Sequence, residues 1–188
     1  MIIRKARIED AIEISAHLFL AMEEILYQFI GMKNAKEAKK FLLYFVEKEN
    51  NQYSYLNCFV AEGPIGIEGT LNSYDGAQLD VLRKPIIEYI NKHYKADFSL
   101  ENETQQGEYY IDSIGVDPKS QGKGIGTKLL QFVINKYDAN QEILGLLVDE
   151  NNPKAEKLYL NLGFELVGTK VFIGKKMKHL QRKPTKIN

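Results

Sequence analysis

The sequence predicts one domain of mixed α/β architecture. The length of 188 residues fits a single domain of ordinary size. Helical and strand-like hydrophobic periods alternate along the chain, and neither a repeat nor a linker interrupts them. With 44% hydrophobic and 27% charged residues, the composition is that of a globular protein and excludes disorder over the whole chain.

The chain begins with a predicted strand over residues 2–6, followed by two helices. Asp10 is placed to cap the first helix, whose apolar residues recur at helical spacing, and Gly31 is placed to end it. Asn34 is placed to cap the second helix.

The period then changes from helical to strand-like. Apolar runs over 56–62 and 65–73 flank Gly63-Pro64, which indicates a hairpin. Helical spacing returns over 77–94, where Pro85 predicts a kink or two short helices.

The remaining residues alternate between strands and helices. After a polar loop over 95–107, we expect a strand at 108–116, a helix at 121–138, a strand at 143–148, a helix at 152–162, and final strands at 164–167 and 171–177.

The charge balance argues against a nucleic-acid partner. The chain has 25 Lys and Arg against 25 Asp and Glu, whereas proteins that wrap nucleic acid carry a basic excess. Only the last residues are basic without an acid, and we expect a solvated basic tail over 179–188. A tail that contacts a polyanion is the alternative.

Cysteine usage and hydropathy exclude several further classes. Cys58 is the only cysteine, so we expect neither an internal disulfide nor a multi-cysteine metal site, and we expect a buried, inert thiol. No apolar run approaches the length of about 18 residues that a membrane span needs. The first residues lack the apolar core of a signal peptide. We therefore expect a cytoplasmic protein with no membrane partner and no metal.

The most informative segment is glycine-rich and runs from Val116 to Lys128. A strand ends, a turn follows, and a helix opens on Gly122, Gly124 and Gly126. Backbone N–H groups at such a helix start are free and point outward with the positive end of the helix dipole, so they bind phosphate. A tight turn without a ligand is the alternative.

The spacing of the glycines narrows the choice of phosphate. Gly122-Lys123 is followed by glycine rather than Ser or Thr, which argues against a nucleoside triphosphate loop. Gly122 and Gly124 fit the dinucleotide fingerprint, but Thr127 stands at its third glycine. Too little chain follows to complete a dinucleotide-binding sheet.

Residues 121–126, Gln-Gly-Lys-Gly-Ile-Gly, resemble the Gln/Arg-x-x-Gly-x-Gly/Ala signature of the GNAT superfamily of acetyl-CoA-dependent N-acetyltransferases. Residues 109–116 resemble the fourth strand of that family, and 147–164 resemble its next strand and helix. The resemblance covers 108–172 closely and 2–74 in element order. It leaves the segment 75–107 as an unmatched helical insertion in a single acetyltransferase domain over 1–178.

The resemblance implies a mostly antiparallel mixed sheet flanked by helices, and acetyl-CoA as co-substrate. The cofactor is expected in a gap where the fourth and fifth strands splay. Its pantetheine arm would meet the backbone of Ile114, Gly115 and Val116, its pyrophosphate the N–H groups from Gln121 to Thr127, and Asn152 would hydrogen-bond the arm. The segment 121–127 comprises Gln121, Gly122, Lys123, Gly124, Ile125, Gly126 and Thr127. Asn152 also precedes Pro153, so a purely helix-capping role is equally open.

Two side chains are candidates for the chemistry. By the resemblance, Tyr159 lies near the sulfur, and a protonated phenol can donate to the leaving thiolate. Periodicity alone favours a core aromatic instead. An attacking amine must lose a proton, and Asp112, which shares a strand face with Tyr110 and Glu108, is the candidate base. A structural, hydrogen-bonded acid is the alternative for Asp112.

The predicted activity is therefore direct transfer of acetyl from acetyl-CoA to a primary amine, in a small molecule or a peptide, within one ternary complex. We expect residues 15–35 and 75–107 to select the acceptor, because loops commonly carry specificity. The resemblance also allows a homodimer, although no segment specifies one. A non-catalytic acyl-CoA sensor and a dinucleotide-binding protein are the alternatives.

Overall fold

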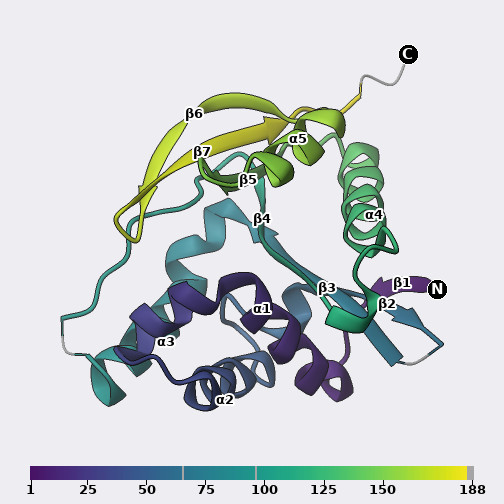
Figure 1. The fold of residues 1–188 in the computed structure, drawn as a ribbon. Helices are drawn as coiled ribbons and strands as arrows, with labels where there is room; N and C mark the ends of the chain where they lie inside the picture. Colours follow the sequence, from purple (N-terminus) through teal and green to yellow (C-terminus); the bar gives the residue numbers. More distant parts are fainter. Residues whose placement is uncertain (65, 96, 186–188) are drawn as a thin grey trace.

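The computed structural model describes residues 1–64, 66–95 and 97–185. Its centre is one sheet of seven strands in the order β1-β2-β3-β4-β5-β7-β6 (Figure 1). The strands are β1 Ile2–Lys5, β2 Cys58–Gly63, β3 Gly66–Asp75, β4 Tyr109–Val116, β5 Leu144–Asp149, β6 Glu165–Phe172 and β7 Lys175–Arg182. Neighbouring strands run antiparallel except β4 and β5, which are parallel. The prediction of a mixed, mostly antiparallel sheet flanked by helices is confirmed.

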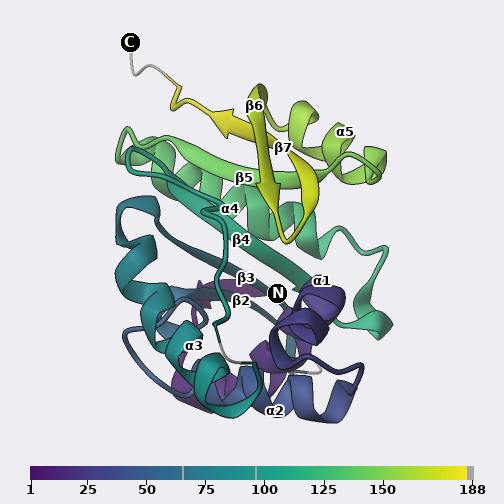
Figure 2. The same cartoon turned by 90° about the vertical axis from the view of Figure 1, so that its left-hand side faces the viewer.

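Helices cover both faces of the sheet (Figure 2). They are α1 Ala11–Ile30, α2 Ala35–Val46, α3 Leu79–His93, α4 Ile125–Ala139 and α5 Pro153–Asn161. The first three share one apolar core, and α4 and α5 pack with the other face in a second core. β4 has apolar clusters on both sides, because Ile111 belongs to the second core whereas Tyr110 packs with Leu79, at the start of α3, in a small third cluster.

Two of the predicted helix signals act as expected. Gly31 ends α1 in the left-handed conformation at φ 68°, and the Asn34 side chain accepts hydrogen bonds from the N–H groups of Lys36 and Glu37. The prediction that the Asp10 side chain caps α1 is wrong. The Asp10 carboxylate does not cap α1 but pairs with Arg4 at 2.7 Å and accepts from the Arg7 N–H.

The segment 75–107 holds one continuous helix rather than the two short or kinked helices that Pro85 predicted. Proline leaves the carbonyl four residues earlier without its helical partner. That residue is Val81, which is 65% exposed, so water can take the bond. After α3 the chain returns along the sheet to β4 through residues 97–108.

The C-terminal strands also differ from the prediction. The expected break at 168–170 lies inside β6, where the register shifts between Leu166 and Gly168, and the hairpin turns at Ile173 and Gly174, both with positive φ. β7 continues to Arg182, so the basic tail expected over 179–188 begins later than predicted. Residues 186–188 of that tail lie outside the described residues.

Candidate active site

The parallel pair β4–β5 opens along its length. The two strands pair only at Tyr109 with Leu144, Tyr110 with Gly145 and Ile111 with Leu146. Beyond these positions β4 continues with β3 as far as Val116, whereas β5 continues with β7 as far as Asp149. The backbone edge of residues 112–116 therefore faces a gap instead of a strand.

A cavity of about 380 Å³ lies at this gap. Asp112 and Ile114 line it from β4, and Asn152 and Tyr159 line it from α5 and its start. α1 closes it from the side of the first core, with Met22 among the lining residues. The structure thus brings together the predicted catalytic pair and two of the predicted cofactor contacts.

The glycine turn directly follows the free edge of β4. Gly122 and Gly124 have φ of 77° and 74°, a conformation that favours glycine, and a Cβ at either position would meet no atom within 4 Å. Gly124 starts α4 without a side-chain cap, so no cap occupies the first N–H groups of α4. Gly126 has no positive φ, and its place is the first turn of the helix.

The side chains of Gln121 and Lys123, two other polar residues of the turn, contact residues that are close to them in the sequence. The Gln121 amide donates to the Val116 carbonyl at 3.4 Å, and the Lys123 ammonium lies 3.3 Å from the Ser120 hydroxyl. Together with the helix dipole, Lys123 makes the turn electropositive. These residues fit the diphosphate of a coenzyme A, since an open glycine cradle lies at the positive end of a helix.

Gly115 and Asn152 have structural roles as well. A Cβ on Gly115 would overlap the His17 carbonyl oxygen, so glycine here allows α1 to cross β4. The Asn152 oxygen accepts a hydrogen bond from the Ala155 N–H at 3.1 Å and so caps α5. The capping role is present, and the Asn152 amide group lies at the cavity.

Tyr159 projects from α5 into the same cavity and packs edge-on against Phe164 at a ring distance of 6.0 Å. Among the described residues, no hydrogen bond occupies its hydroxyl. Burial raises the pKa of Tyr159. The phenol is therefore protonated at neutral pH and can act as a proton donor.

Asp112 lies on a bulge of β4. Asn72 pairs with Ser113 and Ser73 with Ile111, so Asp112 is the extra residue, and such bulges re-aim side chains. The Asp112 carboxylate accepts a hydrogen bond from the Gln52 amide at 3.0 Å. Burial, the largest effect, raises the pKa of Asp112, although the Gln52 hydrogen bond and the charge of Arg83 lower it.

Glu108, the residue before β4, is held by groups other than those around Asp112. It accepts hydrogen bonds from Gln181 at 2.6 Å and Thr104 at 2.7 Å, and it pairs with His179 at 2.9 Å. Although burial is the largest effect on its pKa and raises it, the His179, Gln181 and Thr104 hydrogen bonds outweigh that effect, and the net pKa is lowered. Cys58 is fully buried, and burial raises the pKa of its thiol to about 12, so it is no nucleophile.

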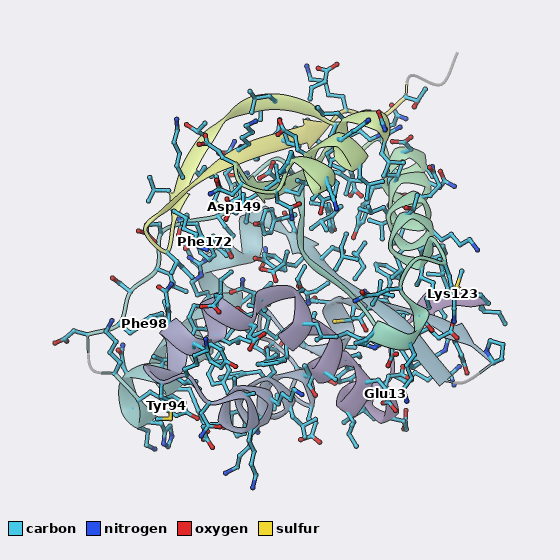
Figure 3. All side chains as sticks on the ribbon, in the orientation of Figure 1. Glu13, Tyr94, Phe98, Lys123, Asp149 and Phe172 are labelled. Atoms are coloured by element: carbon cyan, nitrogen blue, oxygen red, sulfur yellow. The ribbon has the colours of Figure 1, made fainter. Side chains whose placement is uncertain are left out.

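A second cavity, of about 330 Å³, adjoins the first between α1 and the β6–β7 turn. Asp149 and Phe172 line both cavities, and Figure 3 shows them above α1. Its acidic residues are Glu23, Glu24 and Asp149. α1 departs from helical geometry at Met22, where it faces both cavities.

Of the two segments expected to select the acceptor, 15–35 and 75–107, only the first lines these cavities, through α1. None of the described residues of 75–107 lines either cavity. Sequence reasoning also missed Gln52 and Tyr53, which reach the site from the segment after α2. Their only signal was a polar run that ended a helix.

In the part of the chain that the structure describes, no group of three or more His, Cys, Asp or Glu side chains is placed to hold a metal ion. None of the helices in that part of the chain is both long and apolar enough to cross a membrane.

The protein is thus a mixed α/β protein with an open glycine turn beside a splayed strand pair. Residues 87–164 match the model of the Acetyltransferase (GNAT) family. The spermine/spermidine N(1)-acetyltransferase of Bacillus subtilis (strain 168) is 31% identical over 144 residues, which cover 69% of this chain and 91% of that protein. The chain belongs to the GNAT family of acetyltransferases.

Other relatives and structures agree with this assignment. N-alpha-acetyltransferase RimI of Mycobacterium tuberculosis (strain ATCC 25618 / H37Rv) is 38% identical over 73 residues, or 39% of this chain. The match spans 45% of the length of that relative. A crystal structure of an acetyltransferase superposes with a TM-score of 0.80 at 29% identity, covering 98% of this chain and all of that one.

Proposed function

We propose that this protein transfers the acetyl group of acetyl-CoA to a primary amine. The observation that carries the proposal is the gap between β4 and β5, which is bounded by the glycine turn and opens into the cavity that holds Asp112 and Tyr159. A cofactor with a diphosphate at one end and a thioester at the other matches that arrangement.

Acetyl-CoA would lie along the free edge of β4. Its diphosphate would accept hydrogen bonds from the N–H groups of Gln121 to Thr127, next to the charge of Lys123. Its pantetheine arm would meet the backbone of Ile114, Gly115 and Val116, opposite Asn152. Because the Asn152 oxygen already caps α5, the amide N–H₂ is the group it has left to donate.

The chemistry we propose is a single displacement. The amine nitrogen attacks the thioester carbonyl carbon, and the carbon–sulfur bond breaks. Asp112 takes the proton that the amine loses, directly or through one water molecule, and the Tyr159 hydroxyl gives a proton to the departing sulfur. The raised pKa of Asp112 suits this role, since a stronger base accepts the amine proton more readily.

We infer that the acceptor is a small cationic amine that enters through the second cavity. Glu23, Glu24 and Asp149 line that cavity, and only Lys175 among its lining residues is basic. Acidic side chains attract a cation and orient it toward the adjoining cavity. The printed name of the Bacillus subtilis relative, a spermine/spermidine acetyltransferase, fits this chemistry.

The test is release of the CoA thiol from acetyl-CoA in the presence of spermidine, spermine or a peptide with a free N-terminus. We expect turnover with the polyamines to exceed turnover with a peptide of neutral side chains. Tight binding of acetyl-CoA without thiol release from any amine would instead favour the sensor module. Binding of NAD in place of acetyl-CoA would favour the dinucleotide-binding protein.

A further inference from the structure

A buried polar cluster lies directly behind Asp112. Glu103, from the segment 97–107, is 1% exposed, and its carboxylate accepts hydrogen bonds from the Gln52 amide at 2.7 Å and the Tyr74 hydroxyl at 2.9 Å. The same two donors reach the Asp112 carboxylate at 3.0 Å and 3.4 Å. Asp112 and Glu103 therefore share the same pair of donors.

The cluster contains one cation for these two carboxylates. Arg83 of α3 is 3% exposed and forms an ion pair with Glu103. It is held there by the Glu101 carbonyl at 2.9 Å. Arg83 is thus committed to Glu103, and Asp112 is the carboxylate that has no cation of its own.

The remaining titratable groups around Asp112 are phenols, together with the Cys58 thiol, whose pKa the charge of Asp112 raises, and Asp149, which lines the same cavity. Tyr53 from the segment after α2, Tyr74 from β3 and Tyr110 from β4 all have pKa values raised well above the usual range, mainly by burial and then by the charge of Asp112. They stay neutral near pH 7. The α1 residues that line the cavity are uncharged, and Glu23 and Glu24 face the second cavity.

We propose that Glu103 is a positioning residue that pairs with Arg83, limits the effect of that cation on Asp112 and so keeps Asp112 a strong proton acceptor. The proposal rests on the proposed role of Asp112 as the base. It gives a function to the segment 75–107, whose described residues contact neither cavity: Arg83 and Glu103 act on the reaction through Asp112.

The balance of charge around Asp112 sets its strength as a base. An opposite charge near an aspartate stabilises its ionised form and weakens it as a base, by about 1 to 3 pH units at close range. Arg83 lowers the pKa of Asp112, and the ion pair with Glu103 limits that effect. In return, Arg83 prevents Glu103 from repelling the ionised Asp112 across the shared Gln52 and Tyr74 donors.

The test changes each charge in turn. Glu103→Gln keeps the shape of the side chain and frees Arg83 to act on Asp112, so the titration midpoint of Asp112 should fall by about 1 pH unit or more. Arg83→Gln leaves the Glu103 charge unpaired, so the midpoint should rise. Because the two variants predict opposite shifts, either one is sufficient if the other does not fold.

Two readouts separate this inference from the proposed function. Carboxyl-carbon NMR, with Asp112→Asn to assign the signal, follows the Asp112 proton in the protein without substrate. The acid limb of kcat/KM, measured with acetyl-CoA and spermidine, should move in the same direction by the same amount. Glu88→Gln on the exposed side of α3 removes the same charge and should move neither.

Each outcome decides one claim. Opposite NMR shifts in the two variants support the role of Glu103 and Arg83, and an Asp112 midpoint unchanged in a folded variant overturns it. If the NMR midpoint moves and the acid limb does not, Asp112 is not the base, so the positioning role fails together with that part of the proposed function. If the wild type turns over no amine, the proposed function fails, and the NMR shift still decides the charge coupling.

Discussion

Gly115 of β4 lies directly beneath His17 of α1, so close that a Cβ on Gly115 would overlap the His17 carbonyl oxygen. This contact seats α1 against the open part of β4 and sets the wall of the cavity at Met22. It also explains why glycine occupies a strand position, where it is otherwise unfavourable.

Gly115→Ala should destabilise the protein by about 1 to 3 kcal/mol, because the new methyl group must push α1 away from β4. Urea unfolding measures the change. Gly168→Ala in β6 is the matched control, since a Cβ there meets nothing within 4 Å, and its effect should stay within about 0.5 kcal/mol. An equal effect of the two substitutions would contradict the close packing at His17.

Gly124→Asp should abolish binding of acetyl-CoA, because a carboxylate at the start of α4 repels the diphosphate. The positive φ of 74° also strains any side chain there, so the control must share that strain. Gly31→Asp, at φ 68° and equally open, ends α1 far from the turn and should bind normally. Calorimetry with acetyl-CoA distinguishes the two, and intact binding by Gly124→Asp would show that the turn is only structural.

Tyr159→Phe should lower kcat by about 100-fold while the affinity for acetyl-CoA stays nearly constant, since the ring packing against Phe164 is kept and only the proton donor is lost. Steady-state kinetics and calorimetry give the two quantities. Unchanged turnover would remove Tyr159 as the acid.

Asp112→Asn should lower turnover by at least about 100-fold and at the same time raise the free energy of unfolding near neutral pH. The pKa of Asp112 is raised in the folded protein, mainly by burial, so folding favours the protonated acid. In the wild type, the contribution of Asp112 to the free energy of unfolding is fully present when the pH is below 3.8, the ordinary pKa of an aspartate. That contribution is lost as the pH rises through the higher pKa of Asp112 in the folded protein. Asn carries no charge and avoids that loss.

Denaturation curves of Asp112→Asn and the wild type, measured from acid to neutral pH, show whether the substitution raises or lowers the free energy of unfolding. The gain in stability should grow with pH and then level off. A variant that is less stable than the wild type at neutral pH would mean that the ionised Asp112 stabilises the fold.

Glu24→Gln should raise KM for spermidine about twofold to fivefold and leave kcat unchanged, which is the range expected for the loss of one solvent-exposed charge pair. The effect should shrink in high salt, because screening weakens exposed pairs. Glu13→Gln, at the other end of α1 in Figure 3, is the control. Equal KM values for Glu24→Gln and Glu13→Gln would exclude the second cavity as the route of a cationic amine.

The sequence predicts those helices and turns for which the hydrophobic periodicity and the capping or turn residue at the end of the element indicate the same boundary. Asn34 and Gly31 mark real helix ends, and the run from Gln121 to Gly126 marks the turn at the gap. The cluster of Gln52 and Glu103 could not be predicted, because a polar residue in a polar segment has the same pattern whether it is exposed or buried. Gln52 lies 60 residues from Asp112 in the chain, and only the folded sheet brings them together.

Asp10 illustrates a second reason why local sequence does not determine every contact. Its position before a helix is typical of a cap, but Arg4 on the neighbouring strand offers a charged partner at 2.7 Å. Arg4 donates two N–H groups to the Asp10 carboxylate, and such a bidentate ion pair adds both energy and geometric specificity, so tertiary structure decides between two local options. Tertiary structure also decides at Gly168. The sequence predicts a break between two strands there, but β6 continues through the glycine with a bulge.

Calorimetric titration with acetyl-CoA, with NAD and ATP as controls, decides whether the gap between β4 and β5 binds acetyl-CoA. We expect saturable binding of acetyl-CoA at micromolar concentration, lost in Gly124→Asp, and no heat from NAD or ATP. Binding of NAD with no binding of acetyl-CoA would contradict it, because the gap between β4 and β5 would then serve a different cofactor.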